Sequence, residues 1–285
     1  MCTLVILRRP EAKWPLVMAA NRDERQSRPW RPPARHWQDR PDVVAGRDVT
    51  AGGSWLGVND DGVVAAVLNR PGTLGPERGK RSRGELVLEA LDHAEAATAA
   101  EALADIDPQS YRPFNLVIAD RYDAFWLHHA GRRPSFRVRT QSGLWREIDP
   151  IHMPMEPSWH EAGREAWPDS QHAEVICQPI PPGLSMVTAH DLNDPMSPLI
   201  NHYLPRFRRA SPPDPESGDW QSWVALLADR TSPDGDPKNA MTVVDAGDFT
   251  TVCSQLLALP AIGEAVMQFA AGRPGEAAFE PVDMQ

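Results

Sequence analysis

The feature that most constrains the fold is the run at residues 63–69 (VVAAVLN), which is apolar on both faces of a strand. A strand of this kind is covered on both sides in a folded protein. The run follows Asn59-Asp60-Asp61-Gly62, a strong turn signal, and another apolar strand candidate at residues 54–58. We therefore expect a hairpin that is buried inside a layered structure.

Other hairpin patterns occur along the chain, and the helical patterns are grouped in its middle. Strands are expected at residues 3–7, 16–20, 115–119, 124–128, 184–189, 241–244, 249–259 and 266–271. Helices are expected from residue 82 onward, where Ser82 and Glu85 have capping-box spacing, and at residues 199–209 and 220–229. Strands and helices do not alternate. We therefore predict an α+β protein of mostly antiparallel sheets with outer helical layers, in a single domain over residues 1–285.

Charge and cysteine content exclude several classes of protein. The chain has 29 Lys and Arg against 39 Asp and Glu, a formal net charge of −10, whereas nucleic-acid binding needs clustered cations. The three cysteines, Cys2, Cys177 and Cys253, are widely separated and lack metal-ligand spacing. We expect neither disulfides nor a metal site. No apolar stretch suits a signal peptide or a membrane span, so we expect a cytoplasmic protein without a membrane span.

Cys2 is the first candidate for chemistry. Methionine aminopeptidase usually cuts a Met-Cys junction, and removal of Met1 would place a thiol and a free α-amine on one residue. An α-amine with a pKa near ~7.7 is a competent base close to neutral pH. Such a residue carries its own general base for attack on an acyl carbon. The alternative is a small buried cysteine on an N-terminal strand.

A polar cluster, Asn21-Arg22-Asp23-Glu24, follows the second strand candidate. The free ends of a hairpin lie side by side, so we expect this cluster at the end of its strand, next to Cys2. An adjacent guanidinium would stabilise a thiolate, and a carboxylate would orient the α-amine. The alternative is an exposed salt-bridge cluster of little energetic value.

Asn69 ends the apolar run at residues 63–69. Its side-chain N–H groups are of the type that stabilises a developing oxyanion. The alternative is an Asn that satisfies the turn before Pro71. The residues alone leave both alternatives open.

Several segments together resemble one family. Asn21-Arg22-Asp23-Glu24 after Met-Cys resembles the signature of the NRDE family, which includes the transport and Golgi organisation 2 proteins. Three further segments resemble family segments in the same order: residues 52–57 (GGSWLG), 83–87 (RGELV) and 114–120 (FNLVIAD). Residues 57–72 are also similar, more distantly, to a stretch of the choloylglycine and penicillin V acylases.

The resemblance implies a fold and a set of roles. Those acylases are N-terminal-nucleophile hydrolases with an αββα sandwich, so the same fold is expected here. It implies Cys2 as nucleophile, Arg22 and Asp23 as its catalytic partners, and Asn69 in the oxyanion hole. Asn21, Glu24, Trp55 and His190 are the candidate substrate-binding residues. Ala189 stands where those acylases carry a further Asn, and His190, Asp191 and Asn193 are the alternatives that would replace it. The segment at residues 249–254 also departs from the family, with Thr250 and Val252 in place of Gly and Arg.

Two functions follow from the resemblance. The first is hydrolysis of a C–N amide bond in a small acyl-amide, with no cofactor. The second is non-catalytic binding or trafficking of haem or lipid, with haem as a bound ligand. The expected partner is a small molecule in either case, and the sequence does not determine the oligomeric state.

Overall fold

The computed structural model describes residues 2–131, 136–139, 145–148, 165–166, 174–244 and 246–285. The strands are β1 (Thr3–Arg8), β2 (Leu16–Arg25), β3 (Trp30–Ala34), β4 (Val43–Asp48), β5 (Leu56–Asn59), β6 (Val64–Asn69), β7 (Phe114–Ala119), β8 (Ala124–His129), β9 (Phe136–Arg139), β10 (Trp145–Ile148), β11 (Glu165–Ala166), β12 (Ile176–Pro179), β13 (Gly183–Val187), β14 (Phe249–Leu259), β15 (Val266–Ala270) and β16 (Glu280–Pro281). The α-helices are α1 (Gly84–Leu91), α2 (Ala96–Ala104), α3 (Pro198–Arg209) and α4 (Gln221–Leu227).

Two large antiparallel sheets form within the described residues. One is six-stranded, in the order β13-β1-β2-β14-β15-β16, and the other is seven-stranded, in the order β12-β8-β7-β6-β5-β4-β3. The predicted hairpin that contains the two-sided apolar run is β5–β6, and β6 lies well inside its sheet. Strands β10, β9 and β11 pair as a small separate sheet.

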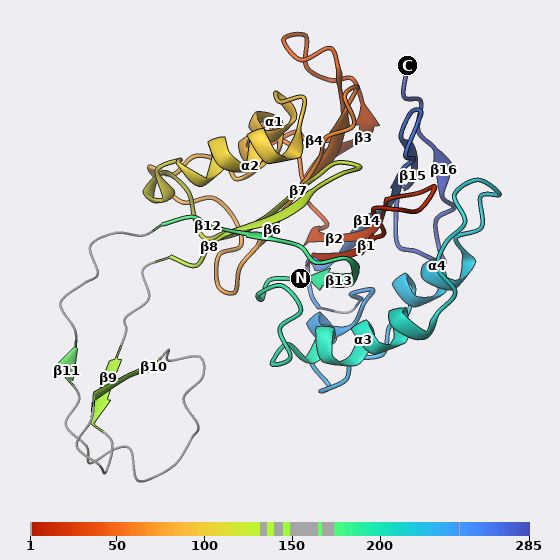
Figure 1. Cartoon of the computed structure of the whole chain (residues 1–285). Helices are drawn as coiled ribbons and strands as arrows, with labels where there is room; N and C mark the ends of the chain where they lie inside the picture. The colour runs from red at the N-terminus through yellow and green to blue at the C-terminus, as the bar shows by residue number, and fades with distance from the viewer. Residues whose placement is uncertain (1, 132–135, 140–144, 149–164, 167–173, 245) are drawn as a thin grey trace.

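The buried side chains form three layers of core, which match the predicted αββα sandwich (Figure 1). Helices α1 and α2 cover the outer face of the seven-stranded sheet, and α3 and α4 cover the outer face of the six-stranded sheet. The third core lies between the sheets, where Ile6, Met18 and Leu257 of one sheet pack with Val64 and Trp126 of the other. Burial of this apolar surface stabilises the sandwich by about 25 cal/mol per Å².

The sequence predictions fail at several places, and strands β4 and β12 were not expected. The chain from Asn21 to Glu24 does not follow the end of a strand, because β2 continues to Arg25. Strand β2 continues because β14 pairs with it from Leu16 to Arg25, whereas β1 pairs with it only as far as Asn21. Residues 241–244 do not form a strand. Strand β3 contains Pro32 and Pro33, and the sheet accommodates them at its edge, where the register with β4 shifts.

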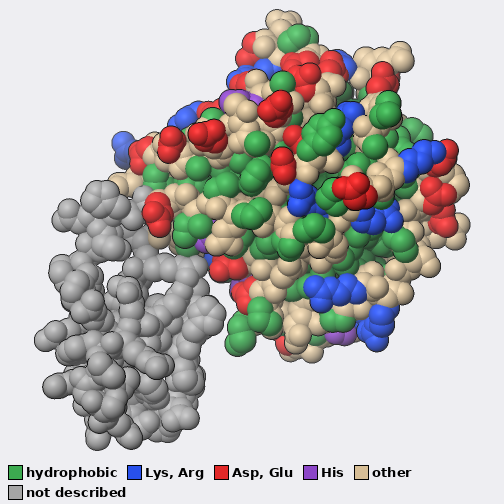
Figure 2. Space-filling view, viewed as in Figure 1, with side chains coloured by type: hydrophobic (Ala, Val, Ile, Leu, Met, Phe, Trp, Pro, Cys, Tyr) green, Lys and Arg blue, Asp and Glu red, His purple; other side chains and the backbone are tan. Residues whose placement is uncertain are grey.

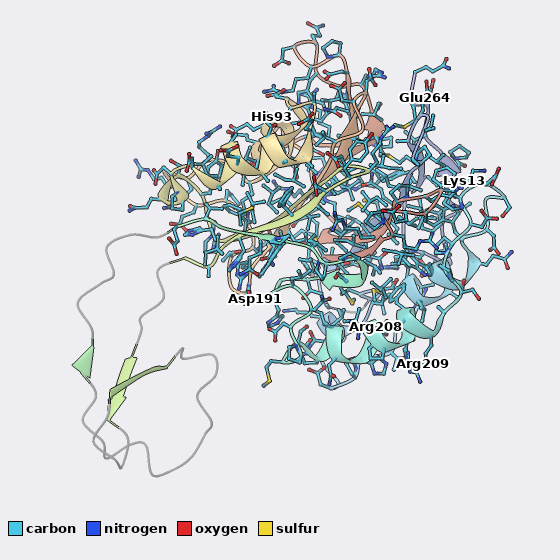
Figure 3. All side chains as sticks on the ribbon, in the orientation of Figure 1. Lys13, His93, Asp191, Arg208, Arg209 and Glu264 are labelled. Atoms are coloured by element: carbon cyan, nitrogen blue, oxygen red, sulfur yellow. The ribbon has the colours of Figure 1, made fainter. Side chains whose placement is uncertain are left out.

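Acidic and basic side chains are interspersed on the face shown in Figure 2. Arg208 and Arg209 on α3 are exposed to solvent (Figure 3). In the part of the chain that the structure describes, no helix has the length and apolar character needed to cross a membrane.

Candidate active site

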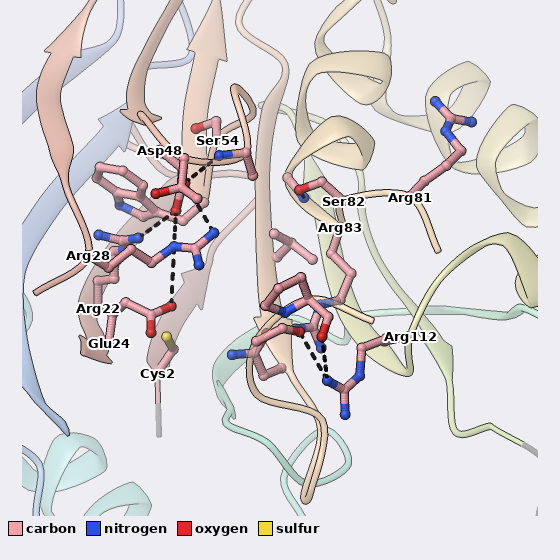
Figure 4. A pocket seen from close by; sticks show the side chains of 18 of the residues that line it. Cys2, Arg22, Glu24, Arg28, Asp48, Ser54, Arg81, Ser82, Arg83 and Arg112 are labelled. Carbon is pink, nitrogen blue, oxygen red and sulfur yellow. Dashed lines mark hydrogen bonds and ion pairs between the residues drawn. The ribbon is translucent and has the colours of Figure 1, made fainter. Parts of the chain in front are cut away.

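A pocket of about 280 Å³ opens beside Cys2 (Figure 4). It lies between residues 22–24 of β2, the end of β6 and the start of α1. Its wall comes from β2, from the connection between β4 and β5, and from the loop between β6 and α1. Six residues predicted from the sequence line it together: Cys2, Arg22, Asp23, Glu24, Trp55 and Asn69. The pocket therefore contains the four residues predicted to be catalytic.

Cys2 is placed by the pairing of the first two strands. Thr3 pairs with Asn21, so the preceding residue lies beside the next part of β2, and Cys2 Sγ donates to the backbone carbonyl of Asp23 at 3.4 Å. The residue is half-buried and reaches the pocket wall. Burial, and next the charge of Asp23, raise the pKa of the Cys2 thiol to about 11. The thiol is therefore protonated near neutral pH.

Arg22 lies beside Cys2 and is held on two sides. Its Nη2 lies 3.0 Å from Asp48 Oδ2, and its guanidinium carbon lies 4.2 Å from the centre of the Trp55 ring. Trp55 is itself fixed by a hydrogen bond of 2.7 Å from Nε1 to Gln255 Oε1. A buried guanidinium held in this way is a fixed positive charge, and it acts to lower the pKa of the thiol against the effect of burial.

Asp48 is a site residue that the sequence reasoning missed. Besides Arg22 it accepts hydrogen bonds from Arg28, at 2.6 Å from Nε and 3.1 Å from Nη2, and from the backbone N–H of Ala51 at 2.9 Å. Glu24 lies 3.8 Å from the same Arg28 Nε. The only available signal was the short apolar run at the start of β4, which places Asp48 at the end of a strand.

Asp23 is 1% exposed and is not part of an exposed salt-bridge cluster. Thr251 on β14 donates to its Oδ1 at 2.6 Å. Burial raises the pKa of Asp23, and the hydrogen bond from Thr251 acts in the opposite direction. Asp23 therefore combines a buried carboxyl group with a backbone carbonyl that contacts the nucleophile candidate.

Asn69 ends β6 at the pocket wall, where it is half-buried. The turn that follows is held by Arg70 and Thr73, whose backbone and side-chain groups bond each other. The side chain of Asn69 makes no hydrogen bond with any residue that the structure describes. Its amide is thus free of the predicted alternative role in the turn and is available to a ligand.

The structure places two of the predicted substrate-binding residues elsewhere. Asn21 is 1% exposed, and its Nδ2 donates to the carbonyls of Leu227 and Met241 at 3.0 and 2.8 Å. These bonds direct its side chain toward α4, away from the pocket. His190 is not part of the pocket wall, and its Nδ1 lies 3.7 Å from Asp194 Oδ2. A substrate contact by either residue stays a prediction.

Ala189, which stands where the related acylases carry an Asn, is buried in a tightly held segment. Asn115 on β7 donates to the carbonyls on either side of it, those of Thr188 and His190, both at 2.8 Å. Asn115 Oδ1 accepts in turn from Arg70 Nη1 at 2.7 Å. Asn115 therefore holds the backbone on both sides of position 189.

No group of three or more His, Cys, Asp or Glu side chains with the geometry of a metal site occurs among the described residues. The pocket wall opposite Cys2 instead carries cations. Arg83 and Arg112 lie there, across the pocket from Cys2 and Glu24 (Figure 4). Neither was assigned a role from the sequence.

The chain is similar to proteins of one family in sequence and to two solved structures in fold. The profile of the family described as Transport and Golgi organisation 2 matches residues 1–150. The Transport and Golgi organization protein 2 homolog of Bos taurus is 36% identical over 119 residues, which are 39% of this chain and 42% of that protein. The Homo sapiens homolog is 34% identical over the same lengths. The chain thus aligns with less than half the length of these curated relatives.

Two solved structures share the fold at 12% sequence identity. One is the Caenorhabditis elegans ortholog of N-acylethanolamine-hydrolyzing acid amidase, with a TM-score of 0.52 over 91% of this chain and 94% of that chain. The other is the mutant C2A of conjugated bile acid hydrolase from Clostridium perfringens, with a TM-score of 0.51 over 100% of this chain and 92% of that chain. Both are N-terminal-nucleophile hydrolases, which confirms the predicted fold. With its profile match across more than half of the sequence, the chain belongs to the Transport and Golgi organisation 2 family.

Proposed function

We propose that this protein hydrolyses a C–N amide bond of a small acyl-amide, with Cys2 as nucleophile after removal of Met1. The observation that carries the proposal is the convergence of Cys2, Arg22, Asp23 and Asn69 on one pocket. A cavity of about 280 Å³ lies at the small end of ligand pockets, which agrees with a small substrate. Met1 lies outside the described residues, so its removal is part of the proposal.

The proposed reaction has two steps. The α-amine of Cys2 takes the thiol proton, and the thiolate attacks the amide carbonyl to give a tetrahedral intermediate. Asn69 donates to the oxyanion, the C–N bond breaks, and the α-ammonium group returns the proton to the leaving amine. Water then attacks the thioester, which releases the carboxylic acid and restores the thiol. The α-amine serves as base in this second step as well.

The electrostatics of the site explain why an internal base is needed. In the chain that keeps Met1 the thiol has a pKa of about 11, and the α-amine freed by Met1 removal lowers this pKa; a thiol that still carries its proton at neutral pH has to be deprotonated during the reaction. Arg22 supplies a fixed positive charge for the thiolate, and Asp48 and Trp55 hold Arg22 in place. Asp23 lies next to the same backbone and orients the N-terminal residue.

The solved neighbours support the reaction class by their names, since one is an amidase and the other a hydrolase of conjugated bile acids. A second candidate is a non-catalytic carrier of haem or lipid, and two observations favour it. The thiol is protonated at rest, and Ala189 and Val252 depart from the related acylases. In a carrier, the same pocket binds its ligand without a nucleophile.

The test begins with the intact mass of the purified protein, which shows whether Met1 has been removed. A thiol-reactive acyl probe should then label Cys2, and a panel of small amides should release amine and acid. Cys2→Ala should abolish both the labelling and the turnover, whereas Cys177→Ala, at an exposed thiol outside the pocket, should change neither. Retention of Met1, or turnover that survives Cys2→Ala, would contradict the hydrolase. Haem or lipid binding that is equal in wild type and Cys2→Ala would support the carrier.

A further inference from the structure

The wall opposite Cys2 contains a guanidinium that has no carboxylate partner. Arg83 Nη1 donates to Thr73 Oγ1 at 2.8 Å and to the carbonyl of Pro113 at 3.0 Å, and its Nη2 donates to the carbonyl of Thr73 at 2.8 Å. All of these acceptors are neutral. No Asp or Glu among the described residues lies within ion-pair distance of this side chain.

Two of the five N–H groups of Arg83 make no hydrogen bond with any residue that the structure describes. The three hydrogen bonds above use both groups on Nη1 and one on Nη2, and leave the Nε–H and the second Nη2–H. An arginine is able to present these two groups to the two oxygens of one carboxylate, sulfonate or phosphate. The side chain is half-buried and lines the pocket.

A second cation lies next to Arg83. Arg112 lies on the same wall, and its Nη1 and Nη2 donate to backbone carbonyls of the loop after β6, among them those of Leu74 and Gly72 at 3.0 and 3.1 Å. Burial, and next the charge of Arg112, lower the pKa of Arg83 to about 10. The charge of Glu24 acts in the opposite direction on this pKa, and the exposed Glu77 lies 3.4 Å from Arg112 Nε.

The other arginines of the pocket have ionic partners. Arg22 and Arg28 share Asp48, Arg81 pairs with Glu85 and Glu89, and Arg112 pairs with the exposed Glu77. Among the arginines that line the pocket, Arg83 is thus the one without an ion pair to any residue that the structure describes, in a chain whose formal net charge is −10. A partly buried cation without a counter-ion is costly to keep, and an anionic ligand would supply the missing partner.

We propose that Arg83, with Arg112 beside it, binds an oxyanion of the substrate, so that the amide cleaved at Cys2 belongs to a molecule that also carries a carboxylate, sulfonate or phosphate. The position of the amide in this arrangement rests on the proposed function. The binding of the oxyanion rests on the contacts of Arg83. A neutral amide fills the same pocket and leaves the two N–H groups without an acceptor.

The kinetic test uses matched pairs of amides. In the first pair, N-butanoyl-β-alanine carries a carboxylate on the amine side of the amide, and its carboxamide is the neutral counterpart. In the second pair, succinic acid monoanilide carries a carboxylate on the acyl side, and butyranilide is the neutral counterpart. For the preferred anionic amide, Arg83→Gln should raise KM about tenfold to a hundredfold, the effect of one charge-assisted pair, with a smaller change in kcat. For its neutral counterpart the change should stay under about twofold. Arg83→Lys should give an intermediate KM, and the exposed Arg208→Gln should match wild type.

A binding measurement separates this inference from the proposed function. Calorimetry with succinate or inorganic phosphate on the Cys2→Ala variant should show binding that Arg83→Gln removes and that sodium chloride weakens. If no amide is cleaved but this binding persists, the hydrolase fails and the oxyanion site stands. If wild type cleaves charged and neutral amides equally and Arg83→Gln changes neither, the hydrolase stands and the oxyanion site is refuted. Should Arg83→Gln not fold, Arg112→Gln and the salt dependence of KM for the charged amide replace it, and no effect in either would also refute the site.

Discussion

The pKa of Cys2 gives the sharpest prediction, because it follows from the placement of one sulfur atom. Burial and the charge of Asp23 raise this pKa from its ordinary value of 9.0 to about 11 in the chain that keeps Met1. At pH 7 the thiolate is then about one part in ten thousand, a hundredfold less than for a thiol of pKa 9.0. A more basic thiolate is intrinsically more nucleophilic, which restores a factor of about ten, so reaction at pH 7 should be about tenfold slower than for an ordinary cysteine.

The assay is reaction with 4,4′-dithiodipyridine between pH 7 and pH 10, on protein whose intact mass shows that Met1 is retained, in a Cys177→Ala background, which removes the exposed thiol. The logarithm of the rate should rise with unit slope over the whole range, because the pKa lies above it. The Cys2→Ala/Cys177→Ala double variant measures the background from Cys253, which is fully buried and whose pKa burial raises to about 12. A plateau that begins below pH 9 would refute the reasoning.

Two variations of the same titration test the causes separately. Asp23→Asn should lower the pKa of Cys2, because the carboxylate charge is the second cause of the increase, but the value should stay above 9.0 because burial is the larger cause. Removal of Met1 places an ammonium group on Cys2 itself and should also lower the thiol pKa. If Asp23→Asn restores an ordinary cysteine, burial is not the main cause.

Three further predictions concern stability. Asp48→Asn leaves the buried Arg22 without its ionic partner and should cost about 3 kcal/mol in urea unfolding, whereas a cost under about 1 kcal/mol would mean that solvent reaches this pair. Asn115→Leu leaves several buried groups without partners and should cost about 3 kcal/mol by the same assay. In Gly53→Ala the new Cβ would lie 2.4 Å from the carbonyl carbon of Gly84, so the start of α1 has to move; a melting temperature equal to wild type would contradict this close contact.

Local patterns were sufficient to predict most of the elements. The two-sided apolar run gave the β5–β6 hairpin, and helical periodicity gave α3 and α4, because each of these signals lies within a dozen residues. Strand β3 was missed because two prolines usually exclude a strand, and only its position at the sheet edge makes them tolerable. The edge position is set by the whole sheet and has no local signal.

The residues of the candidate site also differ in whether local sequence signals predict their positions. Cys2, Arg22 and Asp23 could be placed together because they lie on paired strands close to the N-terminus. The side chain of Asn21 does not join them, because it bonds the carbonyls of Leu227 and Met241, which lie more than 200 residues away in the sequence. The approach of Asp48 to Arg22 depends on how the two sheets pack, and no spacing in the sequence reports that.

The position of β2 between β1 and β14 has a consequence for synthesis. The strand that carries Arg22 and Asp23 receives its second neighbour only when residues 249–259 have been translated, about 230 residues later. Until then Asp23 lacks the hydrogen bond from the Thr251 hydroxyl, and the backbone groups along one edge of β2 are unpaired. A ribosome that adds roughly 5 to 20 residues per second leaves that edge open for tens of seconds. During this interval the edge of β2 is exposed to chaperones, and it is covered when residues 249–259 pair with it.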